Sequence, residues 1–194
     1  MKKIPTLFER VFSGNKIADI KPNITEGCEN AFLHGAATIK LDGSCCAIID
    51  GELYRRYDAK NGKPVPVGAI KCQESADPVT GHLPCWVKCD RNNPSDKWFW
   101  KAYDESTATV GKLPDATYEA IGKHFQGNPY GFDKDYLERH GIREVAVAST
   151  FDAVKEYLKD HYVEGLVFWY AGKPVCKIKR TDFGFSWNQT PERK

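Results

Sequence analysis

The hydrophobic pattern of the chain predicts short strands joined by tight turns. Residues 36–41 (AATIKL) and 117–121 (TYEAI) have the apolar and β-branched character of strands. Residues 44–50 (SCCAIID) and 52–57 (ELYRRY) predict a hairpin, because Asp50-Gly51 is a favoured two-residue turn. Hairpins of this kind join antiparallel strands.

One helix is predicted over residues 150–160. Its apolar side chains recur at helical spacing, and these are Val154, Tyr157 and Leu158. Ser149 with Asp152 resembles a capping box, which marks the start of a helix.

A second hairpin is predicted after this helix. Residues 165–170 (GLVFWY) and 174–179 (PVCKIK) have the character of strands, and a turn at Ala171-Gly172-Lys173 would join them. Regular alternation of strands and helices is missing along the chain. The predicted fold class is therefore α+β with mostly antiparallel hairpins.

The middle of the chain is predicted to be largely loop. Residues 61–115 carry most of the Pro, Asn, Gly and Asp, and this stretch includes the aromatic segment KWFWKAY (97–103). A chain of 194 residues suits one domain, so we expect a single domain over residues 1–194.

Charge and hydropathy exclude few partners but favour a cytosolic protein. The net charge of +2 indicates no special partner, although a local basic cleft is compatible with it. No apolar run approaches the roughly 20 residues of a membrane helix. The start, MKKIPTLFER, resembles a signal peptide until Pro5, Glu9 and Arg10 interrupt it.

The seven cysteines are interpreted as free thiols, mostly buried, in a reducing compartment. One cluster has the residue types of a zinc site, and its members are Cys72, His82, Cys85 and Cys89. The cluster lacks paired CxxC knuckles. We therefore favour scattered thiols, with zinc as the alternative.

The segment Lys40-Leu41-Asp42-Gly43 is the first candidate for chemistry. A lysine ends a predicted strand, and Gly43 would let the backbone approach a phosphate closely. A lysine can act as a nucleophile only when its amine is neutral. At pH 7 only about one in 2,500 ordinary lysines is in the neutral form. Bringing the pKa near 7 takes roughly 4–5 kcal/mol, which burial and neighbouring cations can supply. The alternative is a surface lysine before a turn.

Two further segments carry candidate charges. Glu164 precedes a predicted strand, where its carboxylate could bind a metal ion or simply be solvated. Lys177 and Lys179 are two apart on a strand, so both face one side. They would suit a polyanion and lower the pKa of a third lysine nearby. Alternatively they protect an exposed strand edge from aggregation.

The order KxDG, EGLV, KxK resembles the covalent nucleotidyltransferases, which comprise DNA ligases, RNA ligases and mRNA capping enzymes. YEAIG (118–122) is similar to the strand of that superfamily whose glutamate contacts the ribose. The resemblance narrows to the small family of 5′–3′ RNA ligases that includes the vertebrate cytosolic enzyme. It covers most of residues 36–187, and its segments are KLDGSCC, RYDAK (56–60), GNPYG (127–131), VEGLVFW (163–169) and KIKRTDFG (177–184).

This resemblance implies an enzyme that uses ATP and Mg²⁺ to join RNA 5′-phosphate and 3′-hydroxyl ends. It implies a nucleotidyltransferase core of antiparallel sheets flanked by helices, as a single adenylyltransferase domain over residues 1–194. The chain ends fifteen residues after Lys179, so we expect no OB-fold domain.

The resemblance also implies a role for each matching residue. Lys40 would be the adenylylated nucleophile, followed by Asp42 and Gly43 of the nucleotide-binding motif. The other implied roles are ribose binding for Glu119, Mg²⁺ binding for Glu164, phosphate binding for Lys177 and Lys179, and ribose or RNA-end contact for Arg56, with Arg55 as fallback.

Two departures from the superfamily pattern keep alternatives open. DNA ligases usually have Arg two residues after the KxDG glycine, where this chain has Cys45. No aromatic is assigned to stack on adenine: the candidates, each expected in the core, are Phe125, Tyr130 and Phe168. The alternatives are a DNA ligase or GTP-using capping enzyme, and a non-catalytic RNA- or nucleotide-binding module that uses KWFWKAY.

Overall fold

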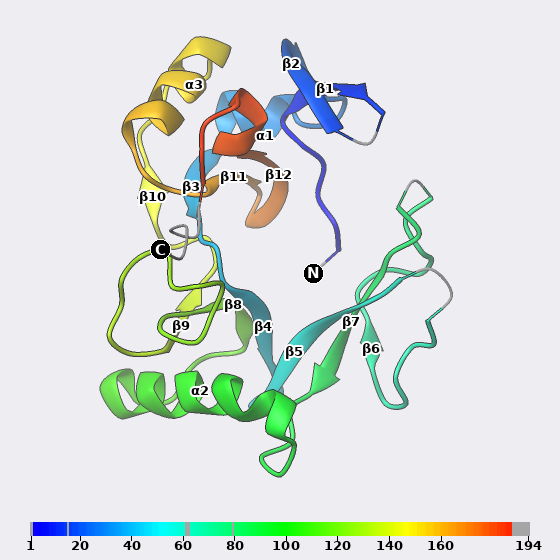
Figure 1. Cartoon of the computed structure of the whole chain (residues 1–194), viewed down its shortest axis with the longest axis vertical. Coiled ribbons are helices and arrows are strands. Elements are labelled where there is room, and N and C mark those ends of the chain that lie inside the picture. Colours follow the sequence, from blue (N-terminus) through cyan, green and yellow to red (C-terminus); the bar gives the residue numbers. More distant parts are fainter. Residues whose placement is uncertain (1, 15, 61–62, 79, 188–194) are drawn as a thin grey trace, which may run out of the picture. The chain divides into compact units, whose positions relative to one another are not determined.

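The computed structural model describes residues 2–14, 16–60, 63–78 and 80–187. The chain divides into two compact units. The first unit comprises Met1–Lys3 and Asp42–His140, and the second comprises Ile4–Leu41 and Gly141–Lys194. Mostly antiparallel strands with few helices build both units (Figure 1), which confirms the α+β class.

The second unit is built on a four-stranded antiparallel sheet. Over the described residues its strand order is β10-β3-β11-β12, and β1 and β2 form a separate hairpin. The elements of this unit are β1 (Phe8–Ser13), β2 (Lys16–Ile24), α1 (Glu29–His34), β3 (Ala36–Lys40), β10 (Glu144–Val145), α3 (Phe151–Asp160), β11 (Gly165–Tyr170), β12 (Lys173–Lys179) and the 3₁₀ helix η2 (Arg180–Phe183).

The two faces of this sheet differ in chemistry because side chains alternate along each strand. On one face the buried side chains include Leu166, Phe168 and Ile178, which share a core with Val154 and Leu158 of α3. Fully burying such a side chain contributes roughly 1.5–3 kcal/mol. The opposite face is thereby left for the lysines of β3 and β12.

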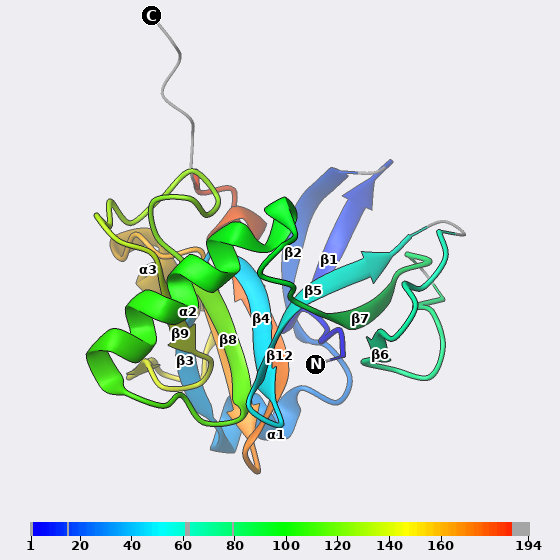
Figure 2. The same ribbon diagram turned by 90° about the horizontal axis from the view of Figure 1, so that it is seen from below.

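The first unit is built on a six-stranded antiparallel sheet, in the order β6-β7-β5-β4-β8-β9 over the described residues. Helix α2 lies across one face of this sheet (Figure 2). The elements of this unit are β4 (Ser44–Ile49), β5 (Glu52–Ala59), β6 (Ile70–Lys71), β7 (Leu83–Lys88), η1 (Pro94–Asp96), α2 (Lys97–Val110), β8 (Ala116–Ile121) and β9 (Tyr136–Arg139).

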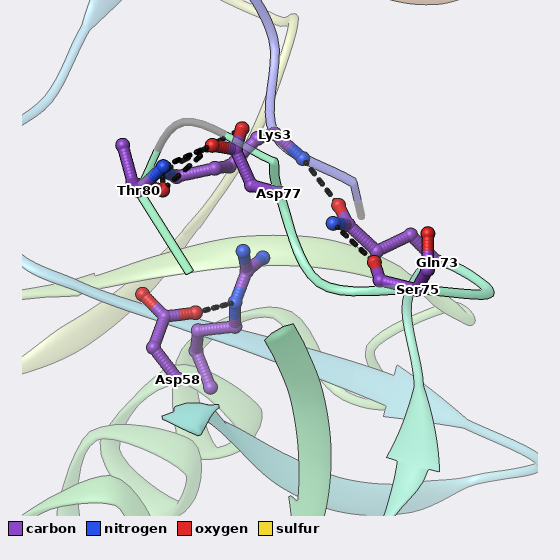
Figure 3. A network of polar contacts seen from close by, with 7 residues as sticks. Lys3, Asp58, Gln73, Ser75, Asp77 and Thr80 are labelled. Atoms are coloured by element: carbon purple, nitrogen blue, oxygen red, sulfur yellow. Dashed lines mark hydrogen bonds and ion pairs between the residues drawn. The ribbon is translucent and has the colours of Figure 1, made fainter. Parts of the chain in front are cut away.

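The N-terminal segment of the first unit is tied to the loop that follows β6. Lys3 Nζ donates a hydrogen bond to Thr80 Oγ1 at 2.5 Å and lies 3.9 Å from Asp77 Oδ2 (Figure 3). Gln73 accepts from the backbone N–H of Lys3 at 3.5 Å. Gln73, Asp77 and Thr80 of this loop thus all contact Lys3.

Both predicted hairpins are confirmed, and both use two-residue turns. Asp50 and Gly51 have φ values of 52° and 76°, as a turn with two left-handed residues requires. In the second hairpin Ala171 and Gly172 have φ values of 49° and 72°. Lys173 already belongs to β12, so the predicted turn was one residue too long.

The prediction that residues 61–115 are largely loop is confirmed only in part, and it missed a long helix. Described parts of this stretch form β6, β7, η1 and the 14-residue α2, and KWFWKAY is the first half of that helix. Five positions of α2 that reach the core recur at helical spacing, namely Trp98, Phe99, Ala102, Tyr103 and Ser106. Trp100 packs against the same core outside this stripe. The segment is rich in aromatics, Ser and Thr, which have a low helix propensity. Burial of this stripe against the sheet stabilises the helix despite that low propensity.

The predicted helix at 150–160 is confirmed, but the prediction of its capping box is wrong. Helix α3 begins after Thr150, whose Oγ1 accepts from the backbone N–H of Ala153 at 3.2 Å. Ser149 instead donates its hydroxyl to the carbonyl of Phe32 at 2.6 Å. Ser149 therefore joins α3 to α1, and Thr150 supplies the cap.

The seven cysteines are free, and five of them are buried, as predicted. Cys72, His82, Cys85 and Cys89 do not converge: over the described residues, the group whose ligand atoms lie close together is Cys45, Glu119 and His140. No helix in the described part of the chain combines the length and hydrophobicity needed to span a membrane.

Candidate functional site

A row of three paired residues places two lysines on one face of the second unit's sheet. Gly165 of β11 pairs with Lys40 of β3 on one side and with Lys179 of β12 on the other. Cross-strand partners share a face, so Lys40 and Lys179 flank a residue without a side chain. A Cβ on Gly165 would lie 2.1 Å from the carbonyl oxygen of Ile178, so only glycine fits there.

The carboxylate of Glu164 bridges these two lysines. Glu164 Oε2 lies 2.5 Å from Lys40 Nζ, and Oε1 lies 2.6 Å from Lys179 Nζ. The residue is only 4% exposed, and its backbone carbonyl accepts from the N–H of Arg180 at 2.9 Å. The structure therefore excludes a solvated junction at Glu164, and a buried carboxylate of this kind requires its ammonium partners.

Lys177 adds a third cation to the same face, one row from Lys179. Its pKa is lowered from 10.5 to about 8, first by burial and then by the charges of Lys40 and Lys179, while Glu164 opposes the shift. The backbone of Lys177 also pairs with Pro5 and Leu7, so this edge of β12 is covered. Lys177 is therefore not an edge-protecting surface lysine, and the cluster has the excess positive charge that suits a polyanion.

The protonated form of Lys177 is expected to destabilise the fold. Because the folded pKa is about 8 and the ordinary value 10.5, the unfolded chain binds more protons between these pH values. Unfolding free energy should therefore rise with pH across that window. Lys177→Met should raise the Tm most at pH 7 and progressively less as pH approaches 10.5. Thermal unfolding at pH 7 and 10 checks this, with the exposed Lys173→Met as control. An increase in Tm that does not depend on pH would contradict this expectation.

Asp182 holds the end of β12 in place. Its buried carboxylate accepts from the backbone N–H of Lys179 at 2.9 Å and from Arg10 Nη2 at 2.7 Å. Arg10 also contributes to the low pKa of Lys177. Sequence analysis identified neither Arg10 nor Asp182. The aspartate five residues after Lys177 in KIKRTDFG was the available signal.

Glu119 and Gly43 come together in the first unit. Glu119 Oε1 accepts from the backbone N–H of Gly43 at 3.1 Å. A Cβ on Gly43 would lie 2.2 Å from the carbonyl oxygen of Ala120, so the close approach to β8 requires glycine. The neighbouring Asp42 donates its backbone N–H to the hydroxyl of Tyr130 at 2.6 Å.

Two further side chains adjoin Glu119. His140 Nε2 lies 2.9 Å from Glu119 Oε2, and Cys45 is the cross-strand partner of Glu119 in β4. Burial raises the pKa of the Cys45 thiol to about 12; Glu119 adds to this shift and Arg56 opposes it. Sequence analysis missed His140, because no local motif links it to Glu119.

The two candidate arginines have different surroundings. Arg55 Nε lies 2.6 Å from Asp96 Oδ1, and Asp96 is 1% exposed at the start of α2. Arg56 Nε lies 3.0 Å from Asp58 Oδ1, in the contact drawn at Asp58 in Figure 3, and its guanidinium lies over Trp86. Both arginines line an open hollow of about 490 Å³ with Gly43, Ser44, Cys45, Ser95, Phe99 and Gln126. Arg55 thus anchors α2, whereas Arg56 pairs with Asp58, and both arginines belong to β5 of the sheet that contains Glu119.

Two of the three aromatic candidates for adenine stacking belong to the cores, as expected. Phe125 is buried against Phe99, and Phe168 is buried against Phe32. Tyr130 is half-buried beside Asp42.

Comparison with known proteins shows what the chain as a whole is similar to. The chain is 25% identical to "RNA ligase 1" of Rattus norvegicus, over 79% of this chain and 69% of that protein. It is 24% identical to the Danio rerio protein of the same name, over 78% and 68%. This chain is similar to vertebrate RNA ligases. The RNA ligase 1 of Mus musculus is 23% identical over 79% and 68%, and no protein-family model matches the chain. The resemblance expected from the motifs is confirmed.

Proposed function

We propose that this chain is an ATP-dependent RNA ligase that joins 5′-phosphate and 3′-hydroxyl ends through an AMP adduct on Lys40. One observation carries the proposal: the buried carboxylate of Glu164 holds Lys40 and Lys179 together on one sheet face. Lys177 on that face completes a cluster of three lysines around one carboxylate. The similarity to proteins named RNA ligase 1 supports RNA as the polymer.

The first step forms the lysine adduct. Lys40 loses a proton to solvent, and its neutral amine attacks the α-phosphorus of ATP. A phosphorus–nitrogen bond forms as the bond to the β-phosphate oxygen breaks, and pyrophosphate leaves. Lys177 and Lys179 would stabilise the negative charge on the phosphates during this displacement.

The next two steps transfer and release AMP. An oxygen of the RNA 5′-phosphate attacks the adenylyl phosphorus, which breaks the bond to Lys40 and leaves AMP capping the RNA. A 3′-hydroxyl then loses its proton and attacks the capped phosphate. A phosphodiester forms and AMP leaves.

Residues of the first unit would hold the nucleoside and the RNA end. Glu119 would accept hydrogen bonds from the ribose hydroxyls, and Arg56 would contact the ribose or the RNA end. Asp42 and Gly43 follow Lys40 in the sequence by two and three residues. We propose that both units act as a single adenylyltransferase domain, with a nucleotidyltransferase core of antiparallel sheets flanked by helices.

Glu164 would also contribute to Mg²⁺ binding. Each carboxylate oxygen contacts one ammonium group and keeps a second lone pair, and Mg²⁺ typically uses one or two carboxylates together with substrate phosphates. The donor set therefore fits. When bound, Mg²⁺ would neutralise phosphate charge.

Removal of the Glu164 charge tests this assignment. Glu164→Gln keeps the side-chain volume but leaves the clustered lysines without their carboxylate. Adduct formation should fall, and the Mg²⁺ concentration for half-maximal rate should rise. The matched control is Glu144→Gln, an exposed carboxylate of the same sheet. An unchanged Mg²⁺ titration would remove Glu164 from the metal site.

The decisive experiment for the proposed function is intact-mass measurement after incubation with ATP and Mg²⁺. The chain should gain the mass of one AMP with ATP and no GMP with GTP. Labelling by GTP would favour a capping-type enzyme. RNA binding without any adduct would favour a non-catalytic binding module instead.

The ends that the enzyme prefers are expected to be RNA. A compact core would read the few nucleotides beside the break, where the 2′-hydroxyl distinguishes RNA from DNA. Sealing should persist with RNA on the 3′-hydroxyl strand and fall sharply when its terminal nucleotides are DNA. Substrates with each strand made as RNA or DNA measure this. Equal sealing of an all-DNA nick would reassign the enzyme as a DNA ligase.

A further inference from the structure

Three side chains of the first unit bring together ligand atoms of the kinds that a soft divalent cation binds. The Cys45 Sγ, a carboxylate oxygen of Glu119 and a ring nitrogen of His140 all lie within 4.8 Å of one another. Each residue is half-buried, so the group is neither sealed in the core nor fully solvated. Thiolate, imidazole and carboxylate are the ligand types of Zn²⁺.

The register of the sheet explains why these residues meet. Cys45 of β4 pairs with Glu119 of β8, and Glu119 pairs with Glu138 of β9. His140 follows β9 directly, and its backbone N–H donates to the carbonyl of Thr117 at 3.1 Å. The carboxylate of Glu119 thus adds negative charge beside the thiol and the imidazole, which favours a cation.

Hydrogen bonds already orient two of the three ligands. His140 Nδ1 lies 3.0 Å from Thr117 Oγ1, which leaves Nε2 directed at Glu119. The other oxygen of Glu119 accepts from the backbone N–H of Gly43. Metal-binding histidines and carboxylates characteristically have such outer partners, which fix the tautomer and the side-chain direction.

We propose that Cys45, Glu119 and His140 form a binding site for a soft divalent cation of the Zn²⁺ type. Three protein ligands leave the fourth tetrahedral position to water or another small ligand. Ligand distances of about 2.0–2.3 Å separate neighbouring ligand atoms by about 3.3–3.8 Å. Glu119 Oε2 and His140 Nε2, now 2.9 Å apart, would separate slightly. Cys45 would release its thiol proton to solvent, and the proton on His140 Nε2 would exchange through solvent so that Nδ1 carries the N–H and donates to Thr117 Oγ1.

Cobalt is the probe that tests this site, because a thiolate bound to Co²⁺ gives a charge-transfer absorption band. The full chain, titrated with Co²⁺, should bind one equivalent and show this band, and Zn²⁺ should abolish it by displacement. Cys45→Ser should lose the band. His140→Gln should weaken Co²⁺ binding by about tenfold or more.

The matched control is Cys72→Ser, which removes another half-buried thiol of the same unit outside the group. This variant should keep both the band and the affinity. Circular dichroism should show that all three variants remain folded. No band in the wild type, a band retained in Cys45→Ser, or unchanged affinity in His140→Gln would each overturn the site. These readouts are independent of adduct formation with ATP, so this inference and the proposed function can fail separately.

Discussion

Lys40→Ala is expected to abolish covalent incorporation of AMP. The proposed nucleophile is the amine of Lys40, while Lys177 and Lys179 are assigned to the phosphates. Lys40→Arg separates this role from a purely structural one, because arginine keeps the cation beside Glu164 but stays protonated at any working pH. Intact mass after incubation with ATP and Mg²⁺ should show one AMP on the wild type and none on either variant.

Supply of pre-adenylylated RNA provides the control for the Lys40 variants. Sealing of this substrate bypasses the lysine adduct, so Lys40→Arg should retain measurable sealing while it fails with 5′-phosphate RNA and ATP. Its thermal unfolding should remain close to that of the wild type, because the charge beside Glu164 is kept. A mass gain of one AMP in either variant would assign the nucleophile elsewhere.

Local signals predicted the strands that meet in hairpins. Asp50-Gly51 and Ala171-Gly172 carry the left-handed backbone that two-residue turns need, so the flanking strands could be assigned from sequence. The hairpin of β1 and β2 was missed although Gly14 and Asn15, which separate the paired Ser13 and Lys16, are favoured turn residues. Most of the nine residues of β2 are exposed and only Ile20 is buried, so the strand lacks the apolar alternation that identifies a half-buried strand.

Helix α2 was not predicted although its core-facing side chains recur at helical spacing, and much of its stability comes from tertiary packing. Its segment contains Trp, Phe, Tyr, Ser and Thr, which are weaker helix formers than Ala or Leu. Ala102 and Ser106 are nevertheless buried, and Ser106 Oγ accepts from the backbone N–H of Leu137 at 2.8 Å. The contacts of α2 with β9 cannot be predicted from the sequence of the helix alone.

The cluster of Lys40, Lys177 and Lys179 could be expected from the order of the sequence motifs. The hydrophobic pattern of the individual segments did not predict it. Lys40 and Glu164 are 124 residues apart, and their contact depends on the pairing of β3 with β11. The alternation of β12 did predict that Lys177 and Lys179 share a face. Sequence analysis missed Arg10 and His140 because each meets its partner through sheet order and side-chain packing, whereas Asp182 lies only three residues after Lys179 in the KIKRTDFG segment.

Lys179→Ala is expected to reduce the rate of adduct formation by at least about 100-fold, the usual scale for loss of a preorganised charge stabiliser. Lys179 Nζ lies 2.6 Å from Glu164 beside Lys40, where it would face the phosphate charge that develops as pyrophosphate leaves. The backbone bond from Lys179 to Asp182 does not involve the deleted side chain, so the end of β12 should stay in place. Glu164 keeps Lys40 as a partner, so the variant should be less stable but still folded, and the loss of rate should appear in the folded protein.

Single-turnover rates of adduct formation at saturating ATP measure this effect directly. A slower rate at saturation means that Lys179 stabilises the transition state, whereas a higher ATP requirement alone would mean ground-state binding. Lys173→Ala is the matched control, because Lys173 lies on the same strand but is exposed at the turn. It should cost almost nothing, since an isolated exposed charge contributes little. A normal rate in folded Lys179→Ala would show that the cluster is structural, and Glu164 and Lys40 would then have to act on ATP without it.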